Sequence, residues 1–173
     1  MLILGVDPGL RATGYGLVDG SAQGVRLIDA GVIRTEDEVP LAHRLHAIHE
    51  SLEGVVSRHA PDAVAVEDLY AAPRYPRTAI LMGHVRGVVC QAAAAKGIEV
   101  VALPPAAVKH AVAGFGAASK DQVQLAVQRV LGLPAPLEGH AADAVAMALV
   151  ALSRRGVPLR SAAAEPAAAQ GGV

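Results

Sequence analysis

The chain begins with MLILGVDPGLRATGYG (residues 1–16), in which an apolar run ends at an aspartate and a Pro-Gly turn follows. The short apolar run at residues 2–7 predicts a buried strand. Residues 13–19 alternate in polarity and predict a second strand, and residues 25–34 predict a third. Three strands joined by short turns indicate an antiparallel meander.

Beyond this meander, two further strands are each reached through a helix. Apolar residues recur at steps of three and four over residues 41–59, which predicts a helix. The apolar runs at 63–66 and 98–102 predict strands, the first at the centre of a sheet, separated by a helix over about 77–96. Because the connections are helical, these later strands should lie parallel. The predicted fold is α/β, a five-stranded mixed sheet flanked by helices.

Three more helices are expected after the fifth strand. A short one follows Pro104-Pro105 to about residue 113, and a second starts at Ser119-Lys-Asp-Gln122, which fits a capping box. The third covers residues 140–154. The sequence after Gly156 is rich in Ala, Pro and Gly and predicts a disordered tail. We therefore expect one domain over residues 1–155 and a tail over 156–173.

Composition excludes several classes of protein. Hydrophobic residues make up 53% of the 173 residues, which excludes a disordered chain. The net charge is −1, so positive charge for binding DNA would have to be local. The single cysteine, Cys90, excludes a disulfide framework and agrees with a reducing compartment. Without a secretory signal or an apolar run of about 18 residues, we expect a cytoplasmic protein with no membrane partner.

Acidic residues occupy three positions that suggest metal chemistry. Asp7 and Glu67 each end a predicted strand, and Asp143 lies among small apolar residues of the last helix, three positions after His140. Each acid alone could be a solvated strand end or a helix-terminal acid. Three converging carboxylates would repel one another without a cation, and Mg²⁺ prefers such ligands. Two such ions can activate water and stabilise the leaving oxygen of a phosphodiester.

Several motifs occur together and in order, and they resemble the RuvC family of bacterial Holliday-junction resolvases over about residues 1–153. The motifs are Asp7-Pro-Gly-Leu-Arg-Ala-Thr-Gly-Tyr-Gly16, Val66-Glu67, Gly83-x-x-Arg-Gly87, Val108-Lys109, Gly116-x-x-Ser-Lys-x-Gln122 and Ala141-Ala-Asp-Ala144. The resemblance implies a ribonuclease-H-like fold and a homodimer that cuts four-way DNA junctions in recombination and repair. It also implies paired, symmetric nicks with 5′-phosphate and 3′-hydroxyl ends, and the RuvA–RuvB branch-migration complex as a partner.

The resemblance also implies a set of metal ligands. These are Asp7, Glu67 and Asp143, together with position 140. Many relatives carry aspartate at that position, whereas this chain has His140. Because imidazole is softer than carboxylate, the site should accept Mn²⁺ as well as Mg²⁺.

Basic residues near these acids are candidates for binding DNA. The resemblance assigns Lys109 and Lys120 to phosphate contacts near the scissile bond, and Lys120 also follows a helix cap, where backbone amides favour phosphate. Tyr70, in the loop after the fourth strand, could stack on a base or pack against its own loop. Any single cation could instead be a solvated surface charge. The candidate cations are Arg11, Arg74, Arg77, Arg86, Lys109 and Lys120.

The predicted helix over 77–96 is a candidate dimer interface. Symmetric resolution needs two cuts related by a two-fold axis, so two copies of one acidic cluster are the economical arrangement. This helix is apolar over a wide surface, which suggests cover on two sides. The alternative is that one subunit buries it completely. The apolar surface comprises Ile80, Leu81, His84, Val85, Val88 and Val89.

Three other functions remain open from the residues themselves. Asp7-x-Gly9 with Thr13-Gly14 resembles the phosphate-binding hairpin of actin-like and sugar-kinase-like ATPases, but those proteins duplicate the fold and are far longer. A catalytically silent DNA-binding module would not need the three acids. A related nuclease acting on another branched nucleic acid would keep them.

Overall fold

The computed structural model describes residues 1–68, 76–104 and 119–162 of the chain. The predicted short helix over 105–113 lies outside these residues. In the described ranges, no helix has both the length and the apolar character needed to span a membrane. The elements in chain order are β1 (Leu2–Asp7), β2 (Ala12–Ser21), β3 (Gly24–Arg34), α1 (Leu41–His59), β4 (Ala63–Glu67), α2 (Pro76–Ala94), β5 (Glu99–Leu103), α4 (Lys120–Leu131) and α5 (Gly139–Arg154).

The five strands form one mixed sheet, as predicted, and their order is β3-β2-β1-β4-β5. β1 pairs with β2 and β2 with β3 in antiparallel fashion, whereas β1 with β4 and β4 with β5 are parallel. Val6 pairs with Val66. The residues that follow this pair are Asp7 and Glu67, so the two central parallel strands end side by side with a carboxylate on each.

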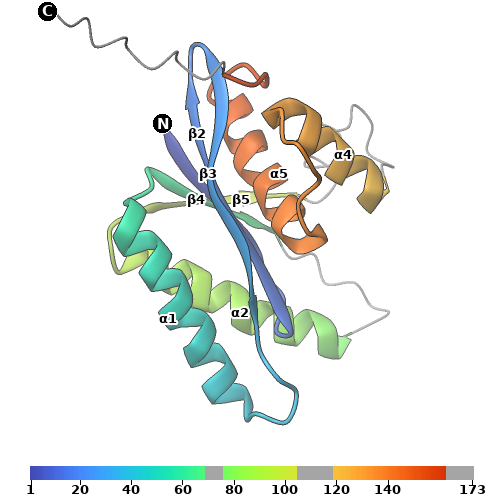
Figure 1. Cartoon of the computed structure of the whole chain (residues 1–173). Helices are drawn as coiled ribbons and strands as arrows, with labels where there is room; N and C mark the ends of the chain where they lie inside the picture. Colours follow the sequence, from blue (N-terminus) through green and yellow to red (C-terminus); the bar gives the residue numbers. More distant parts are fainter. Residues whose placement is uncertain (69–75, 105–118, 163–173) are drawn as a thin grey trace, which may run out of the picture.

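Helices cover both faces of the sheet (Figure 1). α4 and α5 pack on one face, and α1 and α2 pack on the other. α5 lies so close to the sheet that a Cβ on Gly5 would be 1.9 Å from the carbonyl oxygen of Ala144. A Cβ on Gly14 would be 2.0 Å from the carbonyl oxygen of His140. The glycines of β1 and β2 therefore let the backbone of α5 touch the sheet, which fixes where its polar residues emerge.

The apolar surface predicted for α2 is partly used inside the subunit. Val85 and Val89 are 0% and 2% exposed and belong to the core shared with α1. Leu81 lines the cleft described below. Ile80, by contrast, is 61% exposed. Val85 and Val89 therefore belong to the side of α2 that its own subunit covers, and the side that contains Ile80 is open to a partner.

The packed part of the chain continues past residue 155, where the sequence had suggested a tail. Val157 and Leu159 pack against the core. The backbone N–H of Val25 donates to the carbonyl of Arg160 (2.8 Å), and the N–H of Ala162 donates to the carbonyl of Val25 (3.0 Å). The segment up to Ala162 thus lies along β3, and residues 163–173 lie outside the described part.

Candidate active site

The predicted acids converge on one cleft of about 1020 Å³ at the end of the sheet. Asp7 and Glu67 reach it from the ends of β1 and β4, and Asp143 and His140 reach it from the first turns of α5. Lys120, the first residue of α4, lines it as well. The cleft therefore joins residues that are far apart in the sequence, such as Asp7 and Asp143, which are 136 positions apart.

Asp7 and His140 form a close polar contact in this cleft. The distance from Nδ1 of His140 to Oδ2 of Asp7 is 2.8 Å. The Asp7 side chain is 16% exposed and that of His140 is 40% exposed. Position 140 is thus adjacent to a predicted metal ligand, as the resemblance implied. The imidazole can donate to the carboxylate or be turned toward a cation that the carboxylate also binds.

Lys120 lies near the second acid of α5. Its Nζ is 3.9 Å from Oδ2 of Asp143, and its side chain is 79% exposed. The helix start is fixed by the predicted capping box: the N–H of Gln122 donates to the Ser119 hydroxyl, and the N–H of Ser119 donates to the Gln122 side chain. The ammonium group is therefore carried by a well-defined helix N-terminus whose free amides also favour anions.

The donor set suits a hard divalent cation, although its members are not gathered around one point. The carboxylates of Asp7, Glu67 and Asp143 and the imidazole of His140 line the cleft. Among the residues that the structure describes, however, no three acidic, histidine or cysteine side chains lie close enough together to hold one ion. The Asp7–His140 contact explains part of this spacing, because it directs the carboxylate toward the imidazole. Oxygen ligands with one nitrogen fit Mg²⁺ or Mn²⁺.

The structure shows which of the candidate cations line the cleft. Arg77, exposed on the first turn of α2, lines the cleft. Arg86 does not: its Nε donates to the carbonyl oxygen of Glu67 (3.2 Å), and its Nη2 is 3.4 Å from Oδ1 of Asp68. Arg86 thus holds the end of β4. Tyr70, Arg74 and Lys109 lie outside the described residues.

Two charged residues that sequence reasoning missed also line the cleft, Asp37 and Arg44. Arg44 is buried, with 7% of its surface exposed. The signal for it was its position on α1, where Arg44 precedes Ile48 and Leu52 at intervals of four along the buried face. An arginine in an apolar stripe indicates a charge that the fold must pair.

A mixed sheet of this order, with carboxylates at the ends of the two central parallel strands, defines a nuclease of the ribonuclease-H-like class. The family model for "Crossover junction endodeoxyribonuclease RuvC" matches residues 3–151. The chain therefore belongs to the RuvC family.

Relatives and solved structures agree with this membership. The chain is 45% identical over 150 residues to the RuvC of Pelotomaculum thermopropionicum, covering 86% of this chain and 91% of that protein. It is 45% identical over 148 residues to the RuvC of Rhodopirellula baltica, covering 85% and 83%. The structure of Thermus thermophilus RuvC in complex with Holliday junction substrate matches with a TM-score of 0.83 at 38% identity, covering 90% of this chain and 96% of that one.

Proposed function

We propose that this chain resolves four-way DNA junctions by metal-dependent, paired and symmetric nicks that leave 5′-phosphate and 3′-hydroxyl ends. The observation that carries the proposal is the convergence of Asp7, Glu67 and Asp143 in one cleft of a RuvC-family chain. Three partly buried carboxylates that line one cleft are favoured by a bound cation, and the solved relative from Thermus was captured with a Holliday junction.

RuvC nucleases are metal-dependent, and in this chain the ligands would be Asp7, Glu67, His140 and Asp143. Bound Mg²⁺, as two ions or with Mn²⁺ in its place, would supply activation of water and charge stabilisation at the phosphodiester. The chain's own residues orient the site: the end of β4 is held by Arg86, and α5 is fixed against the sheet glycines.

Cations around the cleft would hold the DNA strand over these acids. Lys120 is exposed at the start of α4 beside Asp143, and Arg77 is exposed at the start of α2. They come from the two layers on opposite faces of the sheet. Lys120 would contact the phosphate at the scissile bond. Three residues complete the proposed DNA surface: Lys109, on the family resemblance, and Arg74 and the stacking residue Tyr70, on their positions in the sequence after Glu67.

Paired cutting implies a homodimer, and the outer side of α2 around Ile80 is the surface available for it. Two copies related by a two-fold axis place one cleft on each of two strands. The RuvA–RuvB complex is the proposed partner that delivers junctions, and the cytoplasm, where bacterial DNA lies, is the proposed location.

A gel assay with synthetic DNA tests this function. We expect the protein to nick a labelled four-way junction in Mg²⁺ or Mn²⁺ and to leave a linear duplex of the same sequence uncut. The nicked products should be closed by DNA ligase, because their ends are 5′-phosphate and 3′-hydroxyl. Asp7→Asn serves as the inactive control. Equal cutting of junction and duplex would contradict the proposal.

A further inference from the structure

Besides the proposed metal ligands and the cations Arg77 and Lys120, three more charged residues line the cleft: Arg11, Asp37 and Arg44. They come from the β1–β2 turn, the β3–α1 connection and α1. Arg11 Nε donates to Oδ1 of Asp37 at 2.9 Å, and its Nη2 contacts Oδ2 of the same carboxylate. Nη2 of Arg44 is 3.1 Å from Oδ1 of Asp37. One carboxylate therefore bridges two guanidinium groups at the mouth of the cleft.

Arg44 is the fixed end of this chain of contacts. Its Nε donates to the Thr35 hydroxyl (2.8 Å), which in turn donates to the carbonyl of Leu10 (2.5 Å), in the turn that follows Asp7. Its Nη2 is fully covered and has no hydrogen-bond partner among the described residues, so the contact with Asp37 is an ion pair without hydrogen-bond alignment. A buried charge is unfavourable unless it is paired. Arg44 thus sets the position of Asp37.

Arg11 is the outer end. Its side chain is 79% exposed although one edge of the guanidinium is bound to Asp37. A guanidinium carries five donors in one plane, so the Nη1 amine and one Nη2 hydrogen remain for another acceptor. The hydrogen bond from Arg11 lowers the pKa of the Asp37 carboxyl below its ordinary value. Both partners are therefore charged at neutral pH.

We propose that Arg11, held by Asp37 and anchored through it on Arg44, is a binding residue for a phosphate of the DNA backbone in this cleft. The proposal rests on the nuclease function proposed above. A planar guanidinium matches the oxygens of a phosphate in a directional way that an ammonium does not. Because Asp37 already orients the plane of the Arg11 guanidinium, less conformational entropy is lost when this group binds a phosphate.

The residues around Arg11 favour one specific phosphate contact over diffuse attraction of DNA. Two exposed acids, Glu36 and Glu38, flank Asp37, so this part of the rim is not a basic patch that attracts DNA diffusely. Lys120 lies on α4, in the layer opposite to the one that contains Arg44. Phosphate contacts from both layers would hold one strand across the end of the sheet, over Asp7 and Glu67.

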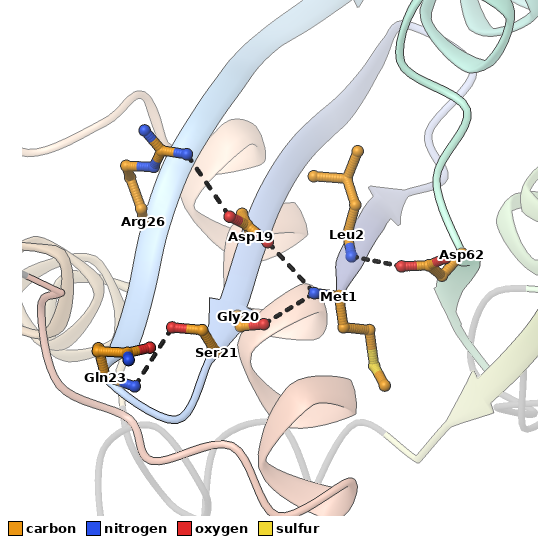
Figure 2. Close-up of polar contacts among 8 residues, drawn as sticks. All are labelled: Met1, Leu2, Asp19, Gly20, Ser21, Gln23, Arg26 and Asp62. Atoms are coloured by element: carbon orange, nitrogen blue, oxygen red, sulfur yellow. Dashed lines mark hydrogen bonds and ion pairs between the residues drawn. The ribbon is translucent and has the colours of Figure 1, made fainter.

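The chain offers a matched control for Arg11. Arg26 forms a salt bridge with Asp19 (3.5 Å) near the opposite end of β3 (Figure 2). The side-chain exposures of the two pairs are similar, at 67% and 37% for Arg26 and Asp19 and 79% and 42% for Arg11 and Asp37. Neither Arg26 nor Asp19 lines the cleft. Arg26→Gln therefore removes an equivalent exposed charge and ion pair from a place that DNA in the cleft does not reach.

The test is junction binding by fluorescence anisotropy in EDTA, where no cleavage occurs, over a series of salt concentrations. Arg11→Gln should weaken binding about five- to tenfold near 0.1 M salt and lower the slope of log K against log salt by about 0.9, the value for one lost phosphate contact. Arg26→Gln should leave both quantities at the wild-type values. Arg11→Lys, which keeps the charge without the planar fork, should restore the slope but only part of the affinity.

The role of Asp37 is read from a double-mutant cycle. If Asp37 orients Arg11, then Arg11→Gln should weaken binding less in the Asp37→Asn background than in the wild type. Equal losses in both backgrounds would overturn that role. Wild-type slope and affinity for Arg11→Gln, with thermal unfolding unchanged, would overturn the phosphate contact itself. Failure of the wild-type protein to bind junctions at all would instead contradict the proposed function, so the two failures are distinguishable.

Discussion

At the scale of single residues, Asp7 contacts His140 at 2.8 Å and also lines the cleft with Glu67 and Asp143. A cation bound there would draw the carboxylates together. The three acids should therefore be needed for DNA cleavage much more than for DNA binding, which depends on lysine and arginine side chains.

We expect Asp7→Asn, Glu67→Gln and Asp143→Asn each to reduce junction cleavage about 100-fold or more, the scale expected when a group that stabilises transition-state charge is lost. Junction affinity in EDTA should stay within about twofold of wild type, because none of these acids donates to phosphate. Single-turnover cleavage and anisotropy measure the two effects separately. A variant that still cuts at a near-normal rate would remove its residue from the site.

His140→Asp should stay active and should lower the ratio of Mn²⁺ to Mg²⁺ cleavage rates, because a hard oxygen ligand replaces a softer nitrogen. It should also make the protein less stable in EDTA, since the new carboxylate would face Asp7 without a cation between them. Thermal unfolding with and without Mg²⁺ reports this second effect. An unchanged metal ratio together with unchanged stability would mean that His140 does not touch the metal.

The residues that sequence reasoning could and could not identify differ in a physical way. Asp7 and Glu67 were predictable because a carboxylate at the end of a buried strand has a defined direction. Arg86 was proposed as a DNA cation, but charge alone does not show which way a side chain points, and the structure aims it at the carbonyl of Glu67. Arg44 and Asp37 were missed because their partners come from separate segments.

At the scale of elements, the contact between α5 and the sheet positions two of the four proposed metal ligands, His140 and Asp143. Nearly every residue of α5 from Ala141 to Leu152 is buried. The helix could be predicted from its sequence, and so could the alternation of helices and strands. How closely α5 packs on the sheet could not be predicted, because this depends on glycines in β1 and β2 that contact the helix backbone only in the folded chain.

Gly5→Ala should therefore destabilise the protein by about 1–3 kcal/mol or more, because the new methyl group would overlap the carbonyl of Ala144. Gly54→Ala is the matched control. Gly54 is exposed on α1, and a methyl group added there would have nothing within 4 Å, so this change should stabilise the helix by about 0.5–1 kcal/mol. Urea unfolding measures both. Equal stability of the two variants would contradict the close packing of α5.

At the scale of the whole molecule, the paired cuts proposed here need two clefts, and α2 connects each cleft to the surface available for a partner. Its inner side packs in the core through Val85, Leu81 lines the cleft, and Ile80 is open. Sequence periodicity could not divide these roles, because the apolar residues of α2 are not confined to one face.

Ile80→Asp should give a folded protein that dissociates at micromolar concentration and loses paired cleavage before it loses junction binding. Val85→Asp should instead unfold the subunit, because it buries an unpaired charge in the core at a penalty of several kcal/mol. Sedimentation and circular dichroism separate the two outcomes. A monomeric wild-type protein that still makes symmetric paired nicks would contradict the proposed homodimer.

The segment up to Ala162 also has a consequence for solubility. β3 is an outer strand of the sheet, and outer strands present backbone groups on which another chain can assemble. At Val25 these groups are engaged by Arg160 and Ala162 of the same molecule. A shortened protein ending at residue 155 would keep the residues of its cleft but would expose the backbone groups of Val25 to neighbouring molecules. Its tendency to aggregate would then depend on a few residues that lie far from the cleft.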